Sequence, residues 1–124
     1  MYEVQYYKDK NGKSPIKDYL NHLSGLAAKG DKDSRIKANQ ITAHILQLEK
    51  LGHRLREPYA KNLGDGIWEL RPIRDRILYV AWENNSFVLL HIFKKDTQKT
   101  PKREVEQAKR NLADLRERGL DSEQ

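Results

Sequence analysis

Two adjacent asparagines, Asn84 and Asn85, constrain the fold more than any other feature of this chain. They separate two runs rich in β-branched and aromatic residues, 76–83 and 86–93. Asparagine tolerates the left-handed backbone of tight hairpin loops, so the pattern predicts two antiparallel strands joined by a two-residue loop. A loop of that length fixes the register. The expected cross-strand pairs are Trp82 with Phe87, Val80 with Leu89, Leu78 with His91, Arg76 with Phe93 and, beyond the strands, Arg74 near Lys95.

A third strand, residues 67–71, is expected to fold back through the turn at 72–75 and to pair Glu69 with Leu78 and Arg71 with Arg76. Side chains alternate between the two faces of a sheet, so each of the three strands places alternate residues on opposite faces. An apolar face that needs a helical cover would carry Trp68, Leu70, Ile77, Tyr79, Ala81, Val88, Leu90 and Ile92. The other face would carry Glu69, Arg71, Arg76, His91, Phe93 and Lys95 at one end, and Val80, Trp82, Phe87 and Leu89 at the other.

The remaining chain predicts an α+β fold with a small antiparallel-rich sheet. A first strand is expected at residues 2–7, and a helix should start at Ser14-Pro15 and be interrupted between Gly25 and Gly30. A second helix is expected from about Asp33 to Leu51, and a charged third helix from Thr100-Pro101 to Gly119. We expect the first two helices to cover the apolar face. The third should cover the apolar half of the other face and leave its basic half open.

The positive charge of the chain is concentrated around the predicted sheet. The 124 residues, expected to form a single domain (1–124), carry a formal charge of +6. Residues 53–103 alone contain 11 Lys and Arg against 6 Asp and Glu. A localised basic surface suits nucleic acid or another polyanion, and it would also suit an acidic protein partner.

Other functional classes are disfavoured by composition. The chain has no cysteine, so disulfides and thiolate zinc sites are excluded, and His22, His44 and His53 lack ligand-like spacing. We therefore expect no metal and no cofactor. The polar segment 2–13 does not resemble a secretory signal, and the longest apolar run, 77–82, is too short to span a bilayer. These features predict a cytoplasmic protein.

Three sequence strings resemble the phage-derived branch of HigB toxins in the RelE/ParE superfamily, and the resemblance covers essentially the whole chain. The strings are Trp68-Glu69-Leu70-Arg71-Pro72, Arg74-Asp75-Arg76-Ile77-Leu78-Tyr79, and Lys94-Lys95 followed by Thr97-Gln98-Lys99-Thr100-Pro101. The resemblance implies a RelE-like α+β fold. It also implies a toxin of a toxin–antitoxin pair that cleaves messenger RNA, commonly on the ribosome, and that a helix-turn-helix antitoxin of the HigA kind neutralises. It also implies that Arg76 binds phosphate, with Arg71 and Lys94 or Lys95 as further basic site residues.

Metal-independent RNA cleavage needs a base for the 2′-hydroxyl proton, cations for the phosphate, and an acid for the leaving 5′-oxygen. Arg71 and Arg76 suit the second role, because arginine stays charged and offers a planar set of donors. Glu69 and His91 are the proton carriers, without assignment of base and acid, and Lys95 completes the candidate catalytic set. The candidate RNA-binding residues are Lys61, Arg74, Lys94, Lys99 and Lys102.

Each residue choice has a structural alternative. Arg71 and Arg76 could form surface ion pairs with Glu69 and Asp75, and His91 could be a hydrogen-bonded core residue. For Trp82 and Phe87, a place in the core beneath the last helix is favoured over a base-stacking surface. For the whole chain, the alternatives are a non-hydrolytic inhibitory toxin of the gyrase-poison type and a basic RNA-binding module.

Overall fold

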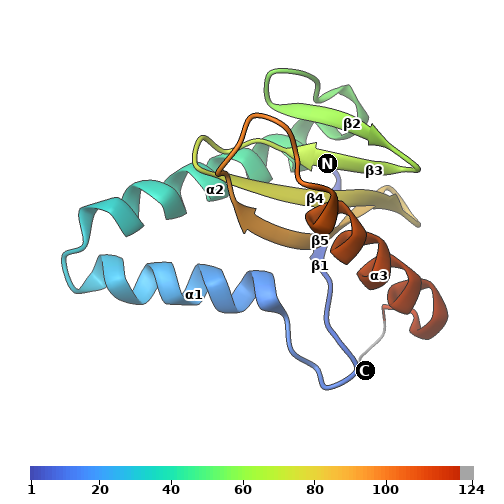
Figure 1. The fold of residues 1–124 in the computed structure, drawn as a ribbon, viewed down its shortest axis with the longest axis horizontal. Coiled ribbons are helices and arrows are strands. Elements are labelled where there is room, and N and C mark those ends of the chain that lie inside the picture. Colours follow the sequence, from blue (N-terminus) through green and yellow to red (C-terminus); the bar gives the residue numbers. More distant parts are fainter. Residues whose placement is uncertain (121–124) are drawn as a thin grey trace.

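A five-stranded mixed sheet forms the centre of this computed structural model, which describes residues 1–120 (Figure 1). Strand β1 lies parallel to β5, and the other neighbouring strands are antiparallel in the order β1-β5-β4-β3-β2. The fold class is α+β, as predicted. The strands are β1 (Glu3–Tyr6), β2 (Ala60–Gly64), β3 (Ile67–Leu70), β4 (Asp75–Trp82) and β5 (Ser86–Lys94).

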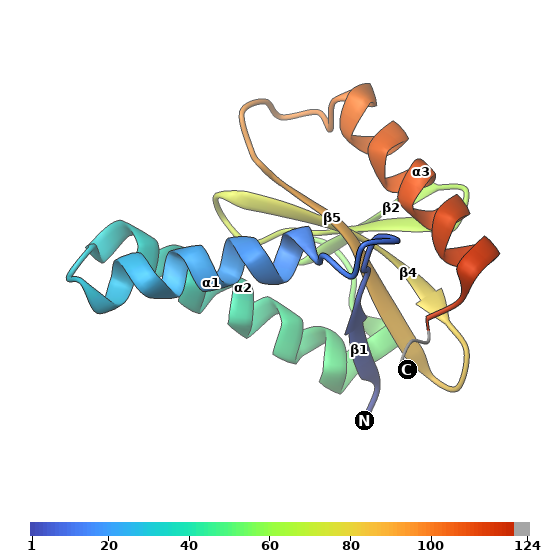
Figure 2. The ribbon, with the colours of Figure 1, turned by 90° about the horizontal axis from the view of Figure 1, so that it is seen from below.

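Helices cover both faces of the sheet (Figure 2). Helices α1 (Pro15–Ala28) and α2 (Lys32–Leu51) pack together on one face, and the 3₁₀ helix η1 (Gly52–Arg54) follows α2 directly. Helix α3 (Lys102–Arg118) lies on the other face, where Ala108, Leu112 and Leu115 are buried. We call the two sides the α1/α2 face and the α3 face. Within residues 1–120, no helix is both long and apolar enough to cross a membrane.

The first helix starts as predicted, but it does not stop where predicted. The Ser14 hydroxyl accepts a hydrogen bond from the Lys17 backbone N–H at 3.4 Å, and proline occupies the first turn. The predicted interruption from Gly25 is wrong, because α1 continues to Ala28. A glycine inside a helix costs about 1 kcal/mol relative to alanine. Packing of α1 against α2 and the sheet offsets that amount, and the turn comes at Gly30, whose φ is +98°.

Strand β2 was not predicted from the sequence. Its residues include Lys61, Asn62 and Gly64, and a register shift interrupts its pairing with β3 between Asn62 and Gly64. An edge strand with one solvent-exposed side lacks the apolar alternation that identifies a buried strand.

The predicted hairpin is present, but its loop is one residue longer than expected. Asn84 and Asn85 adopt the left-handed conformation, with φ of 56° and 55°. Trp82 pairs with Ser86 rather than with Phe87, so the loop consists of Glu83, Asn84 and Asn85. The predicted pairs of Trp82 with Phe87 and Val80 with Leu89 are therefore wrong.

A β-bulge corrects this shift halfway along the hairpin. The register changes between Leu78 and Tyr79, beyond which Leu78 pairs with His91 and Arg76 with Phe93, as predicted. Between the loop and the bulge, the two faces of β5 are exchanged relative to the prediction. Phe87 and Leu89 pack on the α1/α2 face, whereas Val88 and Leu90 pack beneath α3.

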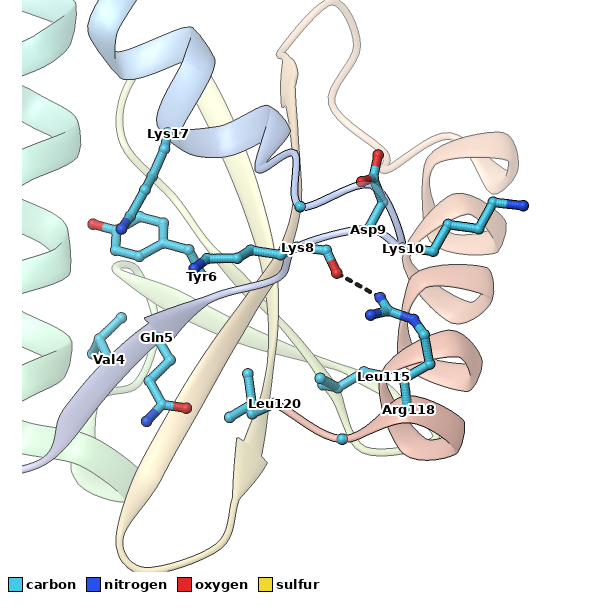
Figure 3. Close-up of a pocket in the computed structure, with 12 residues that line it drawn as sticks. Val4, Gln5, Tyr6, Lys8, Asp9, Lys10, Lys17, Leu115, Arg118 and Leu120 are labelled. Atoms are coloured by element: carbon cyan, nitrogen blue, oxygen red, sulfur yellow. Dashed lines mark hydrogen bonds between the residues drawn. The ribbon is translucent and has the colours of Figure 1, made fainter. Parts of the chain in front are cut away.

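The C-terminal helix is tied to the segment after β1 by a polar cluster. The Tyr7 hydroxyl donates to Asp114 Oδ2 at 2.5 Å, and Arg118 donates to both Asp114 oxygens at 2.8 and 2.6 Å. Arg118 also donates to the Lys8 carbonyl at 2.6 Å (Figure 3). Hydrogen bonding from Arg118, followed by that from Tyr7, lowers the pKa of Asp114 from 3.8 to about 2.

This pKa shift predicts how stability depends on pH. The folded-state pKa of Asp114 is depressed, so its stabilising contribution is present above about pH 4 and is lost as the pH falls through about 2. We expect Asp114→Asn to lower the Tm at pH 7, and the difference from the parent to shrink between pH 4 and pH 2. Glu106→Gln, an exposed change on the same helix, is the control. A Tm difference for Asp114→Asn that does not change with pH would contradict the assignment.

Candidate active site

The α3 face has a polar end where β3, β4 and β5 run side by side. Glu69 pairs with Leu78, Leu78 with His91, and Arg76 with Phe93. Alternation along the strands therefore places Glu69, Arg76 and His91 on one face. Arg71 follows β3 and reaches the same group, since its Nε lies 3.0 Å from Glu69 Oε1. The structure thus brings together four of the five candidate catalytic residues, and the fifth, Lys95, lines a small cavity with Glu69 and Arg76.

Glu69 is almost fully enclosed, with 1% of its surface exposed. Its Oε1 accepts from Arg71 Nε at 3.0 Å, and its Oε2 accepts from the Thr100 hydroxyl at 2.5 Å. A buried carboxylate is costly unless its oxygens are paired, and both are paired here. The expectation of an open basic half-face is therefore wrong at Glu69, because residues 95–101 form a loop over this carboxylate.

The Arg76 guanidinium is held from one side only. Its Nη1 donates to the carbonyl oxygens of Pro72 at 2.6 Å and Asp75 at 2.8 Å. Burial lowers the pKa of Arg76. The negative charge of Glu69 opposes this shift, and the positive charge of Arg71 adds to it. The side chain still carries its charge at neutral pH, as arginine does in proteins. Its Nε and Nη2 donors have no partner within residues 1–120, so they are free to bind an anion.

His91 forms a pair with a residue that sequence analysis did not single out. Its Nε2 lies 2.7 Å from Glu104 Oε1, and both side chains are about one-fifth exposed. The ring stacks on Phe93, with centroids 5.7 Å apart. Glu104 belongs to the first turn of α3, so only the docking of that helix brings it to His91.

Thr100 is a second site residue whose role sequence analysis missed. Thr100-Pro101 was interpreted as the start of the last helix, which is correct in position. The N-cap residue, however, is Pro101, and the Thr100 hydroxyl bonds to Glu69. The sequence gives no signal for this contact, because the two residues are 31 positions apart.

The predicted RNA-binding residues divide into two groups. Lys99 lines the small cavity beside Glu69 and Arg76, Lys61 lies exposed opposite Glu69 across β2 and β3, and Lys102 is exposed at the start of α3. Arg74 instead forms a salt bridge with Asp33 at 2.8 Å, next to α2. Lys94 lines a cavity with Tyr19 and Lys37 on the α1/α2 face. Arg74 and Lys94 therefore lie apart from the polar cluster, and their role in RNA binding stays a prediction.

Asp75 also lies apart from the cluster, although it was considered as an ion-pair partner of Arg76. Its side chain is buried and accepts from the Tyr19 hydroxyl at 3.1 Å, and Lys37 Nζ lies 3.7 Å away. Only its backbone carbonyl contacts Arg76. The side chain thus anchors the start of β4 to α1 and α2, while the main chain orients the arginine.

A cavity of about 990 Å³ lies elsewhere, between the segment after β1 and the end of α3 (Figure 3). Lys8, Lys10, Lys17 and Arg118 line it, and no candidate catalytic residue does. Arg118 is engaged with Asp114, and Lys17 Nζ lies 5.1 Å from the Tyr6 ring centroid. Within residues 1–120, no cluster of three or more His, Asp or Glu side chains is placed to hold a metal ion. The polar cluster on the α3 face is therefore the candidate site with acid–base chemistry.

Comparison with known protein families bears on this site. Residues 31–113 match the family model described as Phage derived protein Gp49-like (DUF891). A comparison with curated protein sequences gave no match. The matched segment includes Glu69, Arg71, Arg76, His91 and Glu104, and the family is phage-derived and toxin-like. The match confirms the predicted relationship to a phage-derived, toxin-like family. The finer assignment to the HigB toxins stays a prediction. The chain belongs to the Gp49-like family of phage-derived proteins.

Proposed function

We propose that this chain is the toxin of a type II toxin–antitoxin system, of the HigB kind, and that it cleaves messenger RNA on translating ribosomes in the cytoplasm without a metal ion. One observation carries the proposal. Two arginines, a histidine–carboxylate pair and Lys95 are gathered at one end of the α3 face, around a buried carboxylate. A surface used only for protein binding or for general RNA affinity does not need a histidine oriented by a carboxylate.

In this proposal the arginines stabilise the phosphate. Cleavage by the 2′-oxygen passes through a pentacoordinate phosphorus with extra negative charge on its oxygens. Arg76 has free Nε and Nη2 donors on a guanidinium already oriented by two carbonyls. Preorganised donors of this kind stabilise developing charge without further rearrangement. Arg71 adds a second positive charge, although Glu69 and Glu57 partly engage it.

His91 is the proposed proton acceptor. Glu69 is enclosed and holds Arg71 and the 95–101 loop, whereas His91 is partly exposed and accessible to substrate. Glu104 orients the ring and stabilises the imidazolium that forms when His91 takes the 2′-hydroxyl proton. The 2′-oxygen then bonds to phosphorus while the bond to the 5′-oxygen breaks, and Lys95 is the proposed proton donor to that oxygen. The products are a 2′,3′-cyclic phosphate and a 5′-hydroxyl.

The surrounding charges suit an RNA strand and imply a means of control. Lys61, Lys99 and Lys102 are exposed around the cluster and would attract the phosphate backbone in a salt-dependent manner. A helix-turn-helix antitoxin would keep the toxin inactive by covering this basic surface or by preventing access to the ribosome. Expression of the toxin alone should then arrest growth, and co-expression of the antitoxin should restore it.

Arg76→Ala tests the charge-stabilising role. We expect cleavage on translating ribosomes to fall about a hundredfold or more, the scale for loss of one preorganised donor. Arg76→Lys should also lose most activity, because lysine keeps the charge but not the planar set of donors. Arg35→Ala is the matched control, because its side chain is exposed on α2, which covers the opposite face of the sheet. Lys99→Ala should weaken binding modestly, mainly at low salt, and reduce its salt dependence. Parental activity in Arg76→Ala would remove the assigned centre.

His91 and Glu104 are tested as a pair. His91→Gln should reduce cleavage by roughly 10²- to 10⁴-fold, the usual contribution of a positioned acid–base group. Glu104→Gln should reduce it less, because glutamine can still orient the ring but lacks the charge that stabilises the imidazolium. Glu106→Gln, on the exposed side of the same helix, should leave the rate unchanged. Parental cleavage by folded Glu104→Gln would show that the pair serves stability alone.

A further inference from the structure

A second cavity, of about 240 Å³, opens on the α1/α2 face of the sheet. Its lining includes His53, Arg56, Trp68, Tyr79, Ala81 and Phe87. Trp68, Tyr79 and Phe87 belong to the core beneath α1 and α2, so the cavity lies on the opposite face from Glu69, Arg76 and His91. Pockets for drug-sized ligands usually measure about 300–1,000 Å³. This smaller cavity suits a single ring system.

Aromatic rings form much of the cavity wall. The centroid of the His53 ring lies 5.0 Å from that of Phe87, and the Tyr79 ring meets Phe87 edge-on at 5.7 Å. The guanidinium carbon of Arg56 lies 5.4 Å from the Trp68 ring centroid. Walls of this kind stack well on flat heteroaromatic rings, whatever their substituents.

Tyr79 adds a polar group that no neighbour satisfies. The residue is 2% exposed, and within residues 1–120 its hydroxyl forms no hydrogen bond. Burial raises the pKa of Tyr79 to about 12, so the hydroxyl keeps its proton at physiological pH. The fully buried, unpaired side-chain atoms in the described part of the chain belong to Gln5, Gln40 and Asp75, so the Tyr79 hydroxyl is open to water from the cavity. A ligand with nitrogen or oxygen atoms along the edge of its ring can replace that water as the partner.

One arginine lines the same cavity. The Arg56 side chain is exposed and contacts the Trp68 ring, and it forms no salt bridge or side-chain hydrogen bond in the described part of the chain. An arginine of this kind favours phosphate, which it can bind through two parallel hydrogen bonds. The combined requirements are a flat ring, a polar ring edge and an attached anion. A phenylalanine or tryptophan side chain of a protein partner meets only the first of them fully.

We propose that this cavity binds the base of a nucleotide, with the base stacked among Trp68, Phe87 and His53 and the phosphate on Arg56. The Tyr79 hydroxyl bonds to the edge of the base. The ligand is either a free nucleotide or one nucleotide of a single RNA strand. The proposal goes beyond the cleavage reaction and does not depend on it, because the two sites occupy opposite faces of the sheet.

Fluorescence of Trp68 provides the test. The chain has two tryptophans, so Trp82→Phe leaves Trp68 as the single reporter inside the cavity. AMP, GMP, CMP, UMP, a single-stranded hexanucleotide and ribose 5-phosphate are titrated in turn, with absorbance correction against free tryptophan. We expect at least one mononucleotide to quench Trp68 saturably, whereas ribose 5-phosphate, which lacks a base, does not. Tighter binding of the hexanucleotide identifies RNA as the source, and equal binding identifies the free nucleotide.

Three variants connect the signal to the cavity. Ala81→Leu fills the cavity from an exposed lining position and should abolish quenching without unfolding the protein, which circular dichroism checks. Tyr79→Phe should weaken binding about fivefold, the usual net value of one hydrogen bond, and leave the Tm unchanged or higher. Arg56→Gln should weaken binding and reduce its salt dependence.

The outcomes separate this proposal from the proposed nuclease. Arg76→Ala should bind nucleotides as the parent does, because it changes the opposite face. The proposal is overturned if no nucleotide quenches Trp68 at millimolar concentration, or if ribose 5-phosphate competes as well as the nucleotides do. It is also overturned if folded Ala81→Leu binds unchanged, or if N-acetylphenylalaninamide binds more tightly than every nucleotide, which would identify a protein side chain as the occupant.

Discussion

The buried carboxylate of Glu69 is the interaction on which the organisation of the candidate site depends. It is bonded from one side by Arg71 and from the other by Thr100. Leaving one charge of a buried pair uncompensated costs about 3–5 kcal/mol, so the arginine and the loop are held where they are. The loop in turn leads directly into α3, whose first turn supplies Glu104 to His91. One enclosed charge thus links strand, loop and helix, and the residues proposed to contact RNA surround it.

Much of the fold followed from sequence patterns with a local cause. The left-handed asparagines located the hairpin, Ser14-Pro15 located the start of α1, and Gly119 located the end of α3. The face assignment of residues 87–90 failed for an equally local reason. Phe87, Val88, Leu89 and Leu90 are all apolar and all buried, so alternation has no polar residue by which to choose a face. The loop length and the bulge decided it, and neither is encoded by periodicity.

The candidate site was predictable to the extent that it lies on strands. The predicted pairs Glu69 with Leu78, Leu78 with His91 and Arg76 with Phe93 are present in the sheet. Because side chains alternate with a period of two, these pairs were enough to place Glu69, Arg76 and His91 on one face. Lys94 and Lys95 were treated together, yet neighbouring strand residues point to opposite faces, and Lys94 faces the α1/α2 side. Glu104 and Thr100 could not be predicted, because they reach the site only through the docking of α3 and the path of the 95–101 loop.

If this cluster cleaves RNA by attack of the 2′-oxygen, the chemistry of the new RNA ends reveals it. After brief expression of the toxin, messenger RNA fragments are ligated to an adaptor with and without prior 5′-phosphorylation, and their 3′ ends are analysed. We expect new 5′-hydroxyl ends, which ligate only after phosphorylation, together with 2′,3′-cyclic or 3′-phosphate ends. New 5′-phosphate ends, or no new ends during growth arrest, would rule out this mechanism.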